Sequence, residues 1–216
     1  MDCQGEQLAL TFGLLIMTIK SQHGRVCIFI DNSNLFHAIK ALKQRERCLN
    51  YARLKERLAN GFDADVRFYY SMPHRPESSN SEAMRQFDKL TRFYEGIKEL
   101  GYQMVGLPLR ERTIFNGTGR TTIPKEKGLD CEIVYDMAIL SRADVYDSFV
   151  LVAGDEDYAR TIRRIRTDVG ISVRVAFFTH AGCSSVLIKE ASDFVDLSQE
   201  IDFLFRETRL KQYVVA

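Results

Sequence analysis

Residues 26–34 read VCIFIDNSN, a run of five apolar residues followed directly by four polar ones. The apolar run is rich in β-branched and aromatic residues and lacks polar alternation, which is typical of a strand buried on both faces of a parallel sheet. Helical periodicity follows from about residue 35 to residue 44. The order of strand, polar turn and helix predicts an α/β fold.

The same order recurs along the chain. Further strands are expected at 65–72, 102–107, 148–154, 171–178 and 193–197. Further helices are expected at 52–59, 81–100, 129–141, 158–168, 184–191 and from 199 to about 211. The long polar segment 108–128 contains an Asn-Gly pair, which predicts a hairpin. We therefore expect one three-layer domain, with a mainly parallel central sheet of about five to six strands flanked by helices.

Composition limits the possible classes. The chain has 216 residues, of which 45% are hydrophobic and 27% are charged, so a folded domain is expected rather than disorder. The formal net charge of +1 gives no global attraction to polyanions, so any nucleic-acid site must be a local patch. Five scattered cysteines without a CxxC pair indicate a reducing, cytoplasmic location and argue against zinc.

The first 24 residues differ from the rest. Residues 8–19 are almost entirely apolar, but the preceding residues carry no base, as a secretory signal would require. The apolar run is also shorter than the roughly 20 residues that span a bilayer. We interpret 1–24 as an N-terminal extension of unassigned role and expect no membrane partner.

Acidic residues cluster where predicted strands end. Asp31 closes the first strand, and Asp155, Glu156 and Asp157 follow the strand at 148–154. Asp130 follows a glycine at the start of a predicted helix. Because the carboxyl ends of parallel strands meet at one sheet edge, these carboxylates should converge there. They would repel one another without a cation, and hard oxygen ligands favour Mg²⁺ or Mn²⁺ over zinc.

Helix capping is the competing interpretation, because Asp and Asn are preferred N-cap residues and each of these acids precedes a helix. For any single acid this interpretation stays open. Capping uses one residue per helix, however, whereas GDED at 154–157 supplies three consecutive acids and DNSN at 31–34 supplies four polar side chains. Taken together, the clusters favour a metal site.

Three segments resemble motifs of the NYN domain, in the LabA-like branch of the PIN-like nuclease superfamily. VCIFIDNSNLFHAIK is similar to the first strand and helix, KGLDCEIVYDMAIL to the KGxD helix, and LVAGDEDYARTIRRIRTDVGISVRVAFF to the SGDxDF strand with the helix and strand after it. Their order and spacing agree as well. The resemblance implies a PIN-like domain over 25–198, with a C-terminal helix in 199–216 packed on it.

The resemblance also implies site residues. The metal ligands, for Mg²⁺ or Mn²⁺, would be Asp31, Asp130, Asp155 and Asp157. Asn34 matches the second polar residue of the first motif and joins these four as a catalytic candidate. Asp136 matches a further acid of the KGxD helix, but it lies about 120° around the helix from Asp130, so both cannot point straight into one site.

Three positions depart from the family pattern. Ala153 stands where such proteins commonly have Ser, Glu156 where a small or polar residue is common, and Tyr158 where Phe is usual. None of the three removes an implied ligand, so they leave the substrate open rather than the metal.

The implied activity is metal-dependent endonucleolytic hydrolysis of RNA, with single strands favoured. No Ser-His-Asp or Cys-His arrangement competes, because the four histidines lie in no motif. Basic residues crowd the helix after GDED and the segment 108–128, as a nucleic-acid backbone requires. The candidate nucleic-acid-binding residues are Lys127, Arg160, Arg164 and Arg120. A solvated helix face and a polar loop are the alternative interpretation of these charges.

Two other functions remain open. A non-catalytic or weakly catalytic RNA-binding or regulatory module would keep the same fold, because folds do not determine activity. A hydrolase of small phosphates is less favoured, because the chain lacks the DxDxT motif of aspartyl-phosphate enzymes. A homodimer through a sheet end or the last helix is also a possibility that the sequence raises.

Overall fold

The structure is a computed structural model that describes residues 24–42, 47–77, 81–116 and 119–207. Six parallel strands form the central sheet in the order β4-β3-β1-β7-β8-β9. Their bounds are β1 Arg25–Asp31, β3 Asp63–Met72, β4 Gln103–Pro108, β7 Ser148–Val152, β8 Ser172–Phe177 and β9 Asp193–Asp196. The expected α/β fold with a parallel central sheet is confirmed.

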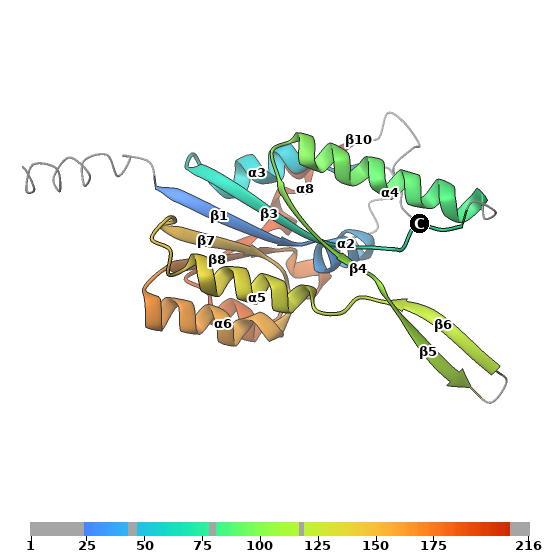
Figure 1. Ribbon diagram of the computed structural model, residues 1–216. Helices are drawn as coiled ribbons and strands as arrows, with labels where there is room; N and C mark the ends of the chain where they lie inside the picture. Colours follow the sequence, from blue (N-terminus) through green and yellow to red (C-terminus); the bar gives the residue numbers. More distant parts are fainter. Residues whose placement is uncertain (1–23, 43–46, 78–80, 117–118, 208–216) are drawn as a thin grey trace, which may run out of the picture.

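Helices cover both faces of this sheet (Figure 1). One layer contains α2 Asn32–Ala41, α3 Tyr51–Ala59, α4 Ser81–Glu99 and α8 Ile201–Leu204. The other contains α5 Leu129–Leu140, α6 Ala159–Arg164 and α7 Ser185–Glu190. Alternate residues of β1 enter the two cores, since Ile28 and Ile30 pack in one and Phe29 in the other. The uninterrupted apolar run of β1 therefore reflects burial on both faces.

Short helical turns complete the connections. They are the 3₁₀ turns η1 Glu156–Tyr158, η3 Thr179–Ala181 and η4 Leu197–Glu200, and the π-helical turn η2 Ile165–Val169. The helix expected at 158–168 is therefore three consecutive pieces, from η1 through α6 to η2.

The C-terminal segment differs from the expected helix. Helix α8 ends at Leu204, and β10 Phe205–Glu207 pairs antiparallel with β2 Arg47–Leu49, a strand that the sequence pattern did not predict. Phe205 is buried against Phe178. Burial of the Phe205 ring and backbone hydrogen bonds to β2 stabilise this segment more than another helical turn would. Residues 208–216 of the expected helix, and the extension before residue 24, lie outside the described residues.

A separate two-stranded sheet follows β4. Strand β5 Arg110–Asn116 pairs antiparallel with β6 Gly119–Lys125, so that Asn116 faces Gly119 across the turn. This hairpin projects from the body of the domain (Figure 1). It confirms the hairpin expected within 108–128. Within the described ranges, no helix is both long enough and apolar enough to cross a membrane.

Candidate active site

The sheet order places a ligand crevice between two particular strands. From β1 the chain builds outward through β3 to β4, and then returns to the other side of β1 to build β7, β8 and β9. Ligands of open parallel sheets bind at such a switch point, outside the carboxyl ends of the strands. Asp31 ends β1, and Asp155 follows the end of β7. Two of the sequence-predicted acids therefore flank the switch point.

Asp31 is a buried carboxylate, with a residue exposure of 4%. Its Oδ1 accepts a hydrogen bond from the backbone N–H of Asn34 at 3.0 Å, which caps α2. Its Oδ2 accepts from Asn34 Nδ2 at 3.1 Å and from the Tyr158 hydroxyl at 2.8 Å. Burial raises the pKa of Asp31, these hydrogen bonds oppose the shift, and the charge of Asp130 adds to it. Asp31 is thus a helix cap and also a desolvated carboxylate whose pKa is raised further by the charge of Asp130.

Asn34 joins the ends of β1 and β7. Its side-chain Oδ1 accepts from the backbone N–H of Gly154 at 3.2 Å, while its Nδ2 donates to Asp31. A Cβ at Gly154 would collide with the ring of Phe177, so any larger residue here would require that ring to shift. Asn34 therefore positions Asp31 across the switch point.

Tyr158 completes this network, although the sequence indicated it only as a departure from the family pattern. The residue is 1% exposed. Burial raises the pKa of its hydroxyl, and the charges of Asp31, Asp130 and Asp155 raise it further. Three carboxylates that the sequence predicted as ligands therefore act on one buried hydroxyl.

Glu126 is a further candidate residue near Asp31, which sequence reasoning did not single out. Its carboxylate is half-buried and accepts hydrogen bonds from the hydroxyls of Ser71 and Ser33. Burial raises the pKa of Glu126, the bond from Ser71 opposes this, and the charge of Asp31 adds to the rise. Its position two residues before the glycine of the KGxD motif was the available signal.

The remaining predicted ligands are exposed. Asp130 lies in the first turn of α5, and Asp155 caps η1 by accepting from the backbone N–H of Asp157 at 3.1 Å. Asp157 is exposed, and its backbone N–H is the donor that Asp155 accepts from. Glu156 accepts instead from Ser184 Oγ at 3.1 Å, at the start of α7. The capping interpretation thus holds geometrically for Asp155 and does not exclude a second role.

Asp136 points elsewhere. Its Oδ2 accepts from Arg67 Nη1 at 2.8 Å and from the Tyr69 hydroxyl at 2.6 Å. This agrees with the angular argument that separated it from Asp130. Asp136 therefore belongs to a part-buried ion pair between α5 and β3. Both of these bonds lead to β3 and away from Asp31 and Tyr158.

The donor set has the chemistry of a Mg²⁺ or Mn²⁺ site but does not form a closed cage. No group of three His, Cys, Asp or Glu side chains among the residues that the structure describes is arranged to hold a metal ion. Mg²⁺ is commonly held by one or two carboxylates, together with waters and substrate phosphates. The buried charge of Asp31 beside exposed Asp130 and Asp155 fits that hydrated form of binding.

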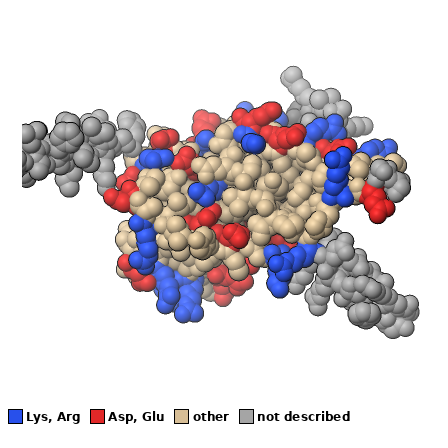
Figure 2. Space-filling view, viewed as in Figure 1, with Lys and Arg blue, Asp and Glu red and all other residues tan. Residues whose placement is uncertain are grey.

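The candidate nucleic-acid-binding residues lie outside this centre. Lys127, Arg160 and Arg164 are exposed, whereas the side chain of Arg120 lies outside the described part. Figure 2 shows Lys and Arg gathered over α6. One cation of this helix is engaged, since Arg163 pairs with Glu190 at 3.5 Å.

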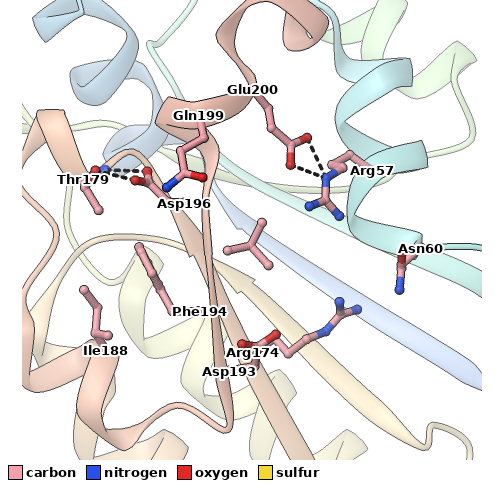
Figure 3. Close-up of a pocket in the computed structure, with 11 residues that line it drawn as sticks. Arg57, Asn60, Arg174, Thr179, Ile188, Asp193, Phe194, Asp196, Gln199 and Glu200 are labelled. Atoms are coloured by element: carbon pink, nitrogen blue, oxygen red, sulfur yellow. Dashed lines mark hydrogen bonds and ion pairs between the residues drawn. The ribbon is translucent and has the colours of Figure 1, made fainter.

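A separate cavity of about 680 Å³ opens beside β9, the last strand of the sheet (Figure 3). Its lining comes from α3, β8, β9 and their neighbours, and includes none of the carboxylates around Tyr158. Several of its charged groups already have partners inside the domain, because Arg57 pairs with Glu200 and Asp196 accepts from the Thr179 hydroxyl. Chemistry therefore locates the candidate site at the switch point rather than in this cavity.

The NYN domain model matches residues 25–199. Among solved structures, the chain is similar to the crystal structure of a protein of unknown function from Vibrio parahaemolyticus, with a TM-score of 0.61 and 20% identity over 82% of this chain and 95% of that one. At this identity the similarity shows the fold alone. None of the curated proteins compared with the chain matches it. Because the family model covers most of the chain, the protein belongs to the NYN domain family, a PIN-like nuclease fold.

Proposed function

We propose that the protein is a divalent-metal-dependent ribonuclease that cleaves phosphodiester bonds within RNA. Membership of a family whose domains are usually nucleases supports this at the level of reaction class. The observation that carries the proposal is the buried carboxylate of Asp31 at the switch point, held by Tyr158 and Asn34, with the charges of Asp130 and Asp155 near enough to raise the pKa of Tyr158. Acidic charge gathered in this way is costly unless a cation is part of the working site.

The residues divide into two roles. Exposed Asp130 and Asp155 face solvent and would hold Mg²⁺ or Mn²⁺ directly or through water, with Asp157 as a further oxygen donor beside Asp155. Asp31 would contribute negative charge from the buried side. When bound, the cation supplies an activated water and neutralises charge on the phosphate.

Asp31 needs support to stay ionised at this position. Burial raises its pKa, so the charged form is disfavoured unless hydrogen bonds or a cation compensate. Asn34 and Tyr158 supply three hydrogen bonds that hold the carboxylate in one orientation. A cation next to Asp130 would supply the remaining compensation. Asn34 and Tyr158 therefore position the carboxylate of Asp31 rather than react themselves.

The test is cleavage of a labelled single-stranded RNA by the purified protein with Mn²⁺, with Mg²⁺ and with EDTA. Asp155→Asn should abolish the metal-dependent cleavage. Glu156→Gln is the matched control, because this neighbouring exposed acid is turned to Ser184. Cleavage that survives Asp155→Asn, or that persists in EDTA, contradicts the proposed site.

The second candidate is an RNA-binding or regulatory module without turnover. The observation in its favour is that no three described side chains form a metal cage. RNA binding without cleavage, equal in the wild type and Asp155→Asn, would select this function. Nucleotides and p-nitrophenyl phosphate in the same assay separate RNA cleavage from hydrolysis of small phosphates.

A further inference from the structure

We infer that Ser184 is a positioning residue of the proposed metal site, which raises the affinity for Mg²⁺ or Mn²⁺ by holding the turn that carries Asp155 and Asp157. Its hydroxyl bonds to Glu156, the residue between these two acids. The inference deepens the proposed function and rests on it for the role of the metal. Metal binding can be measured without cleavage, however, so the two can fail separately.

The acidic turn starts from a backbone position that is held from two sides. The N–H of Gly154, the residue before the three acids, donates to Asn34 Oδ1 at 3.2 Å. Its carbonyl accepts from the backbone N–H of Ser184 at 2.9 Å. Asn34 belongs to α2, and Ser184 is the N-cap of α7. The chain that leaves β7 is therefore fastened to a helix in each of the two layers.

The Ser184 hydroxyl uses its whole hydrogen-bonding capacity. It accepts from the backbone N–H groups of Val186 at 3.2 Å and Leu187 at 3.4 Å, which caps α7. A hydroxyl has one hydrogen to donate, and here it goes to Glu156 Oε2 at 3.1 Å. Because the two N–H groups occupy the acceptor side of the oxygen, its hydrogen is directed to the carboxylate. Ser184 thus joins α7 to the acidic turn through its side chain as well as its backbone.

Two of the three residues of η1 are held in different directions. In a 3₁₀ turn there are three residues per turn, so successive side chains point about 120° apart. Glu156, the first residue, is bonded to Ser184. Tyr158, the third, donates to Asp31 Oδ2 at 2.8 Å. Each bond opposes rotation of the turn about its axis, and together they fix its orientation.

The direction of the two exposed acids follows from this orientation. Asp157 is the middle residue of η1, so its side chain takes the remaining direction, toward solvent. Asp155 precedes η1, and its Oδ1 accepts from the backbone N–H of Asp157 at 3.1 Å. Without the bond from Ser184, Tyr158 alone would hold the side chains of η1. Removal of a group that orients metal ligands typically lowers metal affinity about 10–100-fold.

The test measures Mn²⁺ binding to the full chain by isothermal titration calorimetry. Ser184→Ala and Glu156→Ala each remove one partner of the bond and should weaken Mn²⁺ binding about tenfold, because Tyr158 still holds the turn. The double variant should bind no more weakly than either single variant, because the same bond is lost only once. Glu156→Gln keeps an acceptor oxygen and should bind Mn²⁺ within a few-fold of the wild type.

The matched control removes a helix cap in the other layer. Asn50 caps α3 by accepting from the backbone N–H of Arg53 at 3.3 Å. Asn50→Ala should lower thermal stability as Ser184→Ala does, because each variant loses a cap, but it should keep the wild-type affinity for Mn²⁺. In RNA cleavage, Ser184→Ala should raise the Mn²⁺ concentration that gives half the maximal rate about tenfold and keep the rate at saturating Mn²⁺ within a few-fold.

Several outcomes would overturn the inference. They are wild-type Mn²⁺ affinity in Ser184→Ala, additive losses in the double variant, an equal loss in Asn50→Ala, and no Mn²⁺ binding by the wild type. A loss in Glu156→Gln as large as in Glu156→Ala would also overturn it, because the charge of Glu156 would then matter rather than the bond. The expected pattern of Mn²⁺ binding without RNA cleavage by any of the proteins would retain Ser184 as a positioning residue and remove the ribonuclease proposal.

Discussion

Two acids of the same helix should give opposite phenotypes when each is replaced by alanine. Asp136→Ala should destabilise the fold by about 3 kcal/mol and leave metal-dependent cleavage within a few-fold of the wild type. Asp130→Ala, six residues earlier on α5, should change stability by at most about 1 kcal/mol and abolish cleavage. The pair separates a structural acid from a proposed ligand without changing the helix that carries them.

The magnitudes follow from the contacts. Asp136 Oδ2 accepts from Arg67 Nη1 at 2.8 Å and from the Tyr69 hydroxyl at 2.6 Å, and the side chains of the ion pair are only 23% and 22% exposed. Removing one partner of a buried pair costs about 3–5 kcal/mol, and the partial exposure places this case at the lower end. Asp130 is exposed in the first turn of α5, where its favourable interaction with the helix dipole is worth about 0.3–1 kcal/mol.

Urea unfolding followed by circular dichroism measures the change in the free energy of unfolding, and thermal melts provide a second measure of stability. For a chain of this size, 3 kcal/mol corresponds to a fall in Tm of roughly 6–12 °C. Cleavage is then measured well below both transitions. The reasoning fails if Asp136→Ala keeps wild-type stability but loses cleavage, because Asp136 would then serve the site rather than the fold. It also fails if Asp130→Ala unfolds as readily as Asp136→Ala.

Three further outcomes follow from the site. Burial raises the pKa values of Asp31 and Glu126 above their values in the unfolded chain. In EDTA, their contribution to the free energy of unfolding is therefore full below about pH 4 and falls as the pH rises through the raised pKa values. Melts of the wild type from pH 4 upward should show this fall in stability relative to an Asp31→Asn/Glu126→Gln variant, and a difference between the two proteins that stays constant with pH contradicts the reasoning. Gly154→Ala should lower the free energy of unfolding by about 1–3 kcal/mol in urea titrations, because the added methyl meets the Phe177 ring; unchanged stability would mean that this ring moves freely. Tyr158→Phe should lower the free energy of unfolding by about 1–3 kcal/mol in the same titrations and reduce cleavage, because the buried carboxylate of Asp31 loses a hydrogen-bond donor. Unchanged stability and cleavage would show that water replaces the hydroxyl.

Local patterns were sufficient to predict most of the elements. Burial on both faces gives each central strand a continuous apolar run, and polar residues must follow where the strand meets solvent. This is why the run before Asp31 and the run before Asp155 could be located without a structure, and why both acids were expected at one edge. The helical angle between Asp130 and Asp136 was also sufficient to separate their directions. The carboxylate ligand set itself stays a prediction.

Contacts between distant segments could not be predicted in this way. The bond from Tyr158 to Asp31 and the bonds from Ser33 and Ser71 to Glu126 depend on which strands become neighbours and where each side chain then points. The strand at Phe205–Glu207 replaced an expected helix because β2, far away in the sequence, offers a ladder and a buried place for the Phe205 ring. Sequence alone thus determined the layers of the domain and the sheet edge at which Asp31 and Asp155 follow their strands, since these follow from hydrophobic period and strand direction. Only the tertiary structure decided which groups hold Asp31 and Glu126 in place, because hydrogen bonds between distant residues form only after the sheet order has brought them together.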